Sequence, residues 1–230
     1  LNARIWGVPV QAKAKLSNFT DPLLEASLTS TLSLAVLQGI LKDKLKIILP
    51  GTLKGEGKLF LSLQNKFSSV GSLKINGYLD FLKADLKLEK INSPFAEISG
   101  RMEFSQDQLK SQGLQFKYQE VPYQLSGALT NFKAPQVKLG LSSKDLVLES
   151  NFILENKLLN FSQCKGRYLK SEFSFTGGLD TADSSNLAAD IDGNLNLDLA
   201  DLKILFAKSW KQLEKINPQD GLVLSVDIGF

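Results

Sequence analysis

Hydrophobic and polar residues alternate along much of the chain, most regularly between Asn186 and Leu199. In this stretch the odd positions are Leu, Ala, Ile or Gly, and the even positions from Asp190 onward are Asp or Asn. Side chains of a strand point alternately to the two faces of a sheet, whereas a helix would distribute both classes around its circumference. The alternation therefore predicts a strand with one apolar face and one polar face.

The same two-residue period predicts strands along most of the chain. Short strands are expected at 3–10, 10–17 and 24–28, and a long series of strands follows between 59 and 175. Turn residues or Gly separate the runs at roughly 8–12 residue spacing, which is typical of consecutive antiparallel strands. The phase of the alternation changes after Phe81, from odd to even apolar positions. We expect a long antiparallel meander.

Five glycines lie inside these alternating runs instead of between them. Glycines inside strands mark bulges, bends or close approach of another backbone. For two of them, Gly77 and Gly166, a hairpin turn is an equally good interpretation. The five are Gly77, Gly100, Gly127, Gly166 and Gly193.

Two segments change to helical spacing. Apolar residues between Leu32 and Pro50 recur at intervals of three and four, which predicts a helix of about four turns that continues to Ile48. Residues 201–217 show a similar pattern and are followed by Pro218. A shift of 168 residues aligns Pro218 with Pro50. We therefore interpret strand, amphipathic helix, proline and strand as a unit that occurs twice, near 24–64 and 187–230, on either side of a central meander at 70–180.

Composition restricts the chemistry. The 230 residues include no His and one Cys, Cys164, which excludes His-based acid–base catalysis, Ser–His or Cys–His nucleophiles and His-ligated metals. The net charge of +3 is small and the basic residues are scattered, so nucleic-acid binding is not expected. No window approaches eighteen apolar residues, so no transmembrane helix is predicted. We predict neither an enzyme nor a metal or cofactor site.

Two weaker motifs have simpler interpretations. The Asp and Asn residues at 190–198 resemble calcium ligands, but alternate positions on a strand do not converge as a calcium loop requires. We interpret them as a solvated face. Gly55 to Lys58 echoes a phosphate-binding loop without its full spacing, and we interpret it as a turn. Cys164 is expected to pack as a small apolar residue.

The apolar faces need cover, because about a dozen strands have only two helices to protect them. One solution is a closed β-sandwich. The other is an open, coiled sheet whose concave apolar trough holds a ligand. Acyl chains would suit such a trough because they need no directional bonds. For the open sheet, the expected floor residues are Leu86, Leu88, Ile98, Met102, Leu114, Phe116, Leu125, Leu139, Leu148, Phe173, Ile191 and Leu195.

Two long stretches, together with the N-terminal "GVPVQAKAKLSNFTDPLLEASLTS" in the same style, carry a family resemblance. Their rhythm of strand, Gly, strand and polar turn resembles that of the AsmA-like proteins of the bacterial envelope. The two long stretches are "LNLDLADLKILFAKSWKQLEKINPQDGLVLSVDI" and "AEISGRMEFSQDQLKSQGLQFKYQEVPYQLSGALTNFKAPQVKLGLSSKDL". The resemblance implies a single segment with a curved, open β-groove, similar to that of chorein-type bridge-like lipid transfer proteins. It also implies a periplasmic location in a diderm bacterium, an inner-membrane anchor before Leu1, and no catalytic residues.

Together these features predict a protein that binds lipid acyl chains and conducts phospholipid between the inner and outer membranes. Its expected partners are a phospholipid or other acyl lipid, membranes reached through segments outside this chain, and neighbouring repeats of the same parent protein. The chain starts at Leu1 without Met and stops at Phe230 within a strand-like run, so we interpret it as a piece of a longer protein. The alternative is an envelope assembly module with a closed sandwich core and no lipid cargo.

Overall fold

A computed structural model describes residues 1–46, 48–68, 71–89, 91–180, 188–198, 200–201 and 222–229. The fold is mainly β, and the fourteen strands of the sheet follow one another in chain order. The strands are β1 (Asn2–Ile5), β2 (Val8–Ser17), β3 (Leu23–Ser33), β4 (Gly51–Lys66), β5 (Lys74–Leu88), β6 (Phe95–Ser105), β7 (Gln108–Tyr118), β8 (Val121–Thr130), β9 (Gln136–Ser142), β10 (Leu146–Glu155), β11 (Leu158–Tyr168), β12 (Ser171–Asp180), β13 (Ala188–Leu197) and β14 (Leu222–Gly229).

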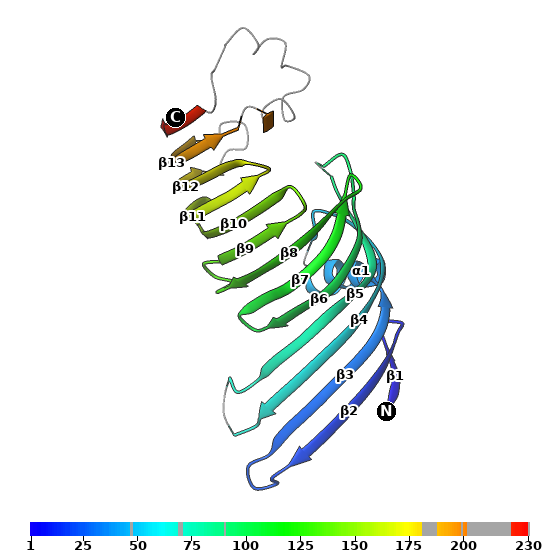
Figure 1. Cartoon of the computed structure of the whole chain (residues 1–230). Helices are drawn as coiled ribbons and strands as arrows, with labels where there is room; N and C mark the ends of the chain where they lie inside the picture. The colour runs from blue at the N-terminus through cyan, green and yellow to red at the C-terminus, as the bar shows by residue number, and fades with distance from the viewer. Residues whose placement is uncertain are drawn as a thin grey trace. The chain divides into compact units, whose positions relative to one another are not determined.

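The sheet is an open antiparallel meander, as the alternation predicts. Its order runs from β1 to β14 without a crossover, and these two strands lie at opposite ends of that order. The closed β-sandwich is therefore wrong. Two compact units are distinguished along the chain, unit 1 (Leu1–Ser126) and unit 2 (Gly127–Phe230). Figure 1 shows the long, curved strands β3 to β7 of unit 1, with the helix α1 (Leu34–Leu45) beside them.

The predicted helix ends earlier than expected. It was expected to continue to Ile48, but α1 ends at Leu45 because Lys46 adopts the left-handed conformation with φ of 59°. The backbone N–H of Lys46 donates to the carbonyl of Leu41, a common C-terminal cap. Ile48 lies beyond this cap and is 78 % exposed. The second predicted helix, at 201–217, lies outside the described residues from 202 onward.

Helix α1 covers part of the apolar face of unit 1. Leu34, at its first turn, is fully buried and is the centre of a cluster with residues of β4 and β5. It lies directly over Gly57, where an added Cβ would be 3.0 Å from Leu34 Cδ2 and 2.9 Å from Leu79 Cδ1. The other buried members of the cluster are Leu53, Leu79, Phe81 and Ala84.

The helix also completes the hydrogen bonding of β4. Strand β3 pairs with β4 only as far as Ser33 opposite Glu56, so the first residues of β4 extend past it. There the side chain of Gln38 donates to the carbonyl of Gly51 and accepts a 3.0 Å hydrogen bond from the N–H of Leu53. The amide of one helical residue thus replaces a neighbouring strand.

The phase change after Phe81 is a β-bulge. The β4–β5 register shifts at Gly55, which has φ of 100°, and the β5–β6 register shifts between Phe81 and Ala84 around Lys83, which has φ of 56°. A third irregularity lies in β6 at Glu97, with φ of 54°. Bulges bend a strand and increase its twist. Because of the extra residue, the apolar face of β5 is formed by odd positions up to Phe81 and by even positions from Ala84 onward.

Gly77 and Gly166 lie within β5 and β11, so the hairpin interpretation of these two positions is wrong. The Phe104 ring lies over Gly77 and the Phe173 ring over Gly166, in the space that a Cβ would occupy. Close approach is therefore the reason for glycine at both positions. Gly100, Gly127 and Gly193 also lie inside strands, as expected.

We predict that Gly57→Val weakens the docking of α1. The added side chain would meet Leu34, Leu79 and the carbonyl of Asp80, and overpacking of this kind costs about 1–3 kcal/mol. The free energy of unfolding in urea should fall, and the α1 amides should exchange faster with deuterium. The control is Gly39→Ala, where a Cβ meets nothing within 4 Å and helix propensity favours Ala by about 1 kcal/mol. Unchanged protection of α1 in Gly57→Val would contradict this account.

Candidate functional site

The candidate site is the apolar face of the sheet. Its cross-strand rows in unit 1 run through β2 to β5, for example Ala12 opposite Leu28, Leu28 opposite Leu61, and Leu61 opposite Gly77. Wherever the register gives a cross-strand partner for a floor residue, that partner is an apolar residue, Gly or Ser. The apolar face therefore offers contact area and few directional bonds.

The seven predicted floor residues of unit 1 are all half-buried, but they have different surroundings. Leu88 lies opposite Gly51 at the end of the β4–β5 pair. Phe116 and Leu125 lie farther along, on β7 and β8. The remaining four pack against the buried cluster around Leu34, and so they extend the core under α1. These four are Leu86, Ile98, Met102 and Leu114.

Phe116 belongs to an aromatic group at the β6–β8 end of unit 1. Its ring stacks on Tyr123 with centroids 5.5 Å apart and meets Phe95 edge-on, also at 5.5 Å. Phe95 in turn lies 5.3 Å from the Tyr118 ring. Phe95 and Tyr123 were not among the expected floor residues. Tyr118 shares the parity of Leu114 and Phe116, which is the signal that identifies it.

The five predicted floor residues of unit 2 share one face of its sheet. Leu148 lies opposite Gly166, and Phe173 lies between Gly166 and Leu195. Leu139 lies opposite Ser150, and Ile191 opposite Gly177. All five are half-buried. In the part of unit 2 whose side chains are described, Cys164 is the one hydrophobic residue that is buried.

Aromatic rings lie on the same face as this buried position, and Phe175 is its cross-strand neighbour. Centroid distances are 5.6 Å for Phe152–Phe161, 5.7 Å for Phe161–Phe175 and 6.3 Å for Phe173–Phe175. Burial raises the pKa of the Cys164 thiol, so it packs as a small apolar group, as predicted. Its cross-strand neighbour Ser150 is also buried, and hydrogen bonding between the Ser150 hydroxyl and the thiol offsets only part of the effect of burial on the thiol pKa. Ser150 shares the parity of Leu148 and was missed because it is polar.

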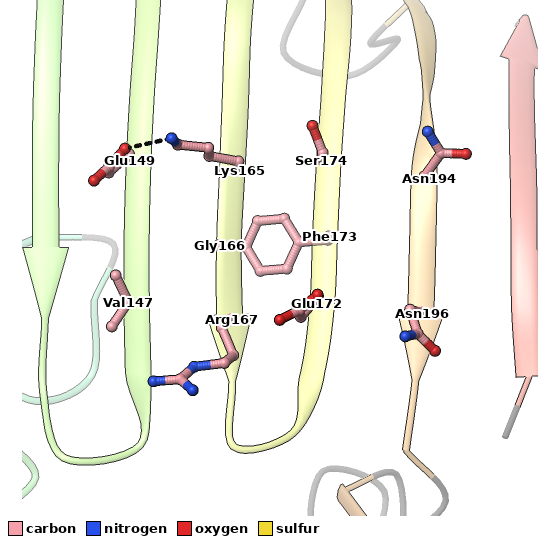
Figure 2. A pocket seen from close by; sticks show the side chains of 10 residues that line it. All are labelled: Val147, Glu149, Lys165, Gly166, Arg167, Glu172, Phe173, Ser174, Asn194 and Asn196. Carbon is pink, nitrogen blue, oxygen red and sulfur yellow. Dashed lines mark ion pairs between the residues drawn. The ribbon is translucent and has the colours of Figure 1, made fainter. Parts of the chain in front are cut away.

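The opposite face is polar in both units. Figure 2 shows this face in unit 2, where Glu149 and Lys165 form an ion pair of 2.9 Å beside a hollow of about 520 Å³. Asn194 and Asn196 line the same hollow and are exposed, as the solvated-face interpretation predicts. The Phe173 ring lies across Gly166.

In unit 1 the polar face carries ion pairs between neighbouring strands. Arg101 makes two hydrogen bonds to the Asp80 carboxylate, of 2.6 and 2.8 Å, and its guanidinium lies 3.7 Å from the centroid of the Tyr78 ring. Hydrogen bonding to Arg101 lowers the pKa of Asp80 and raises that of Arg101. Lys110–Glu103 and Lys117–Glu97 are further pairs, at 3.0 and 2.7 Å. Charge is therefore concentrated on the face opposite the floor residues.

One carboxylate anchors the segment after β13. Asp201 is 3 % exposed and accepts hydrogen bonds from the N–H groups of Lys170 and Ser171 and from the Ser171 hydroxyl, at 2.8, 2.7 and 2.8 Å. Burial raises the pKa of Asp201, but these hydrogen bonds outweigh burial and leave the pKa below its ordinary value. Asp201 thus ties this segment to the β11–β12 turn.

Comparison with family models, curated proteins and solved structures finds no match to this chain. In the described part of the chain, no helix is both long enough and apolar enough to cross a bilayer. The candidate site is therefore defined by the geometry above, in which each unit presents one apolar and one polar face.

We predict that Asp201 contributes stability that depends on pH. Because its folded-state pKa lies below the ordinary value of 3.8, the contribution is present above that value and disappears as the pH falls through the folded-state pKa. Asp201→Asn should lower the thermal midpoint at neutral pH, and the difference from the parent should shrink in acid. Asp192→Asn, an exposed change on the polar face, is the control. A difference for Asp201→Asn that does not vary with pH would contradict the prediction.

Proposed function

We propose that the apolar face of the sheet binds the acyl chains of lipids and conducts phospholipid along it. The observation that carries the proposal is that the sheet is open and that the protein buries only part of its apolar face. Among side chains that the structure describes, nine hydrophobic residues are buried, and eight of them lie in unit 1, around α1 and the adjoining strands. The floor residues of both units are only half-buried, so the face has apolar area available for a ligand.

The chemistry of this face suits an acyl chain. Each methylene group removed from water contributes about 0.8 kcal/mol, and a methylene chain needs no hydrogen-bond partner. Phe116 in unit 1 and Phe173 in unit 2 offer broad ring faces for such contact. The charged head group would remain in solvent, because the charged side chains lie on the opposite face. A uniform apolar surface has no strongly preferred position, so a bound chain would slide passively.

The cellular part of the proposal follows from the resemblance to AsmA-like proteins. We propose a periplasmic segment of a longer protein, anchored to the inner membrane by residues outside this chain and moving phospholipid between the inner and outer membranes. The open meander supports this proposal, because a groove that carries lipid over a distance requires a sheet that continues strand by strand without closing.

One observation favours the alternative of an assembly module. Strand β1 pairs with β2 only as far as Gln11, so among the strands that the structure describes Lys13 to Ser17 form a free edge. Exposed backbone groups of this kind accept a strand from another chain or from a neighbouring repeat. Lysines at such an edge, here Lys13 and Lys15, oppose unspecific pairing. This alternative now rests on edge pairing alone, because the closed core is excluded.

We predict that Phe116→Asp and Phe173→Asp abolish lipid loading. A carboxylate on the apolar face must stay hydrated, which prevents an acyl chain from covering it; a loss of about tenfold or more in bound lipid is expected. Lipid is measured by native mass spectrometry of the purified protein and by solvent extraction. Matched controls are Gln115→Asp and Ser174→Asp, which lie next in sequence on the polar face.

All four variants should keep the circular dichroism spectrum of a β protein. The proposal would be overturned if both apolar-face variants retained as much lipid as the parent and the two control variants. A parent protein that is folded but free of lipid would favour the assembly module.

A further inference from the structure

One end of unit 1 exposes large apolar side chains. Phe19 lies in the turn between β2 and β3 and is 83 % exposed, and Phe67 follows β4 and is 60 % exposed. Because consecutive hairpins alternate direction, both turns lie at the same end of the sheet, as Figure 1 shows. Exposed aromatic residues that gather at one place mark interaction sites more often than single apolar residues do.

The turns are held together, so the two rings belong to one surface. The N–H of Phe67 donates a 3.0 Å hydrogen bond to the carbonyl of Pro22, and Lys66 forms a 2.5 Å ion pair with Asp21. The Ser68 hydroxyl donates to the same Asp21 carboxylate. These contacts fix the β2–β3 turn against the end of β4. A pre-organised surface loses little conformational freedom on binding.

The next turn joins the same end. The side-chain amide of Gln106, in the turn after β6, donates to the carbonyl of Leu73 before β5. Leu73 is itself an exposed hydrophobic residue. Leu16, at the end of β2, is another, and it lies opposite Leu24 in a row of the apolar face. The exposed residues therefore continue the apolar face to its end. We call Leu16, Phe19, Phe67 and Leu73 the apolar tip.

The charges around the apolar tip are balanced. Three lysines and three acidic residues lie on the adjoining strand ends and turns, and Lys66–Asp21 is already an ion pair. They are Lys15, Lys66, Lys74, Asp21, Glu25 and Asp107. The tip thus sets exposed apolar side chains among balanced charges, a combination that suits the interface of a zwitterionic phospholipid bilayer. Lysine side chains beside an inserted ring can keep their ammonium groups in the head-group layer.

We propose that the apolar tip docks on the surface of a phospholipid bilayer, with the rings of Phe19 and Phe67 inserted into the interface. This inference rests on the proposed function, since a sheet that carries acyl chains needs a place where they leave a membrane. The continuity between Leu16 and the apolar face provides that place. Because the charge is balanced, docking depends on aromatic insertion, with little dependence on salt or on anionic lipid.

The experiment is flotation of the full 230-residue chain with vesicles of phosphatidylcholine, with and without phosphatidylglycerol. The affinity of the double variant Phe19→Ser/Phe67→Ser for both vesicle types should be about tenfold lower than that of the parent. Added salt should change the binding of the parent little. The matched control is Trp6→Ser, which removes an exposed aromatic residue from the β1–β2 turn, at the opposite end of β2.

The outcomes separate this inference from the proposed function. When lipid is supplied in solution instead of from vesicles, the double variant should load as much lipid as the parent, whereas Phe116→Asp should load little and still float with vesicles. Equal loss of flotation in the double variant and in Trp6→Ser would mean unspecific adsorption and would overturn the inference. No flotation of the parent, or binding that requires phosphatidylglycerol and disappears in salt, would also overturn it. In each case the lipid extraction still tests the apolar face independently.

Discussion

The structure depends on one constraint: an antiparallel sheet with an apolar face that never closes on itself. Closure or sandwich packing would bury that face within the protein. Here the strand order runs from β1 to β14 without return. Helix α1 covers the face around Leu34 and beside the buried cluster of Val8, Val10 and Leu32, and the floor residues beyond these clusters stay half-buried. The proposed lipid would cover the part of the apolar face that the protein itself leaves uncovered, because burial of apolar area from water is favourable.

The bending of the sheet is associated with irregularities of the backbone. Irregularities at Gly55, Lys83 and Glu97 lie on three successive strands, where they increase bending without moving apolar residues to the wrong face. Phe rings placed over Gly77 and Gly166 fill the space that a side chain would take. On the polar face, ion pairs such as Arg101–Asp80 join neighbouring strands. Exposed pairs contribute little stability each, but they keep charge away from the floor.

Much of the fold and of the site was readable in the sequence. The two-residue period gave the strands and assigned the faces correctly, including Phe173, Ile191 and Leu195 in unit 2. The phase change after Phe81 signalled the bulge. The helix was found, but its end was misplaced, because apolar spacing does not reveal that Lys46 adopts a left-handed conformation. Ser150 was not predicted to lie on the apolar face because its side chain is polar, although it occupies an apolar position of the alternation. Phe95 was not predicted because the bulges interrupt the alternation in β6.

The sequence by itself determined which residues share a face, because the alternation of side chains along a strand is a local property of the backbone. It left open whether the sheet closes, since a sandwich and an open meander use the same alternation. Only the tertiary structure decided that question, through the order in which strands pair. It also decided that Leu86, Ile98, Met102 and Leu114 pack around the α1 cluster, and that turns far apart in sequence bring Phe19 and Phe67 to one end. These are long-range contacts, which no local pattern specifies.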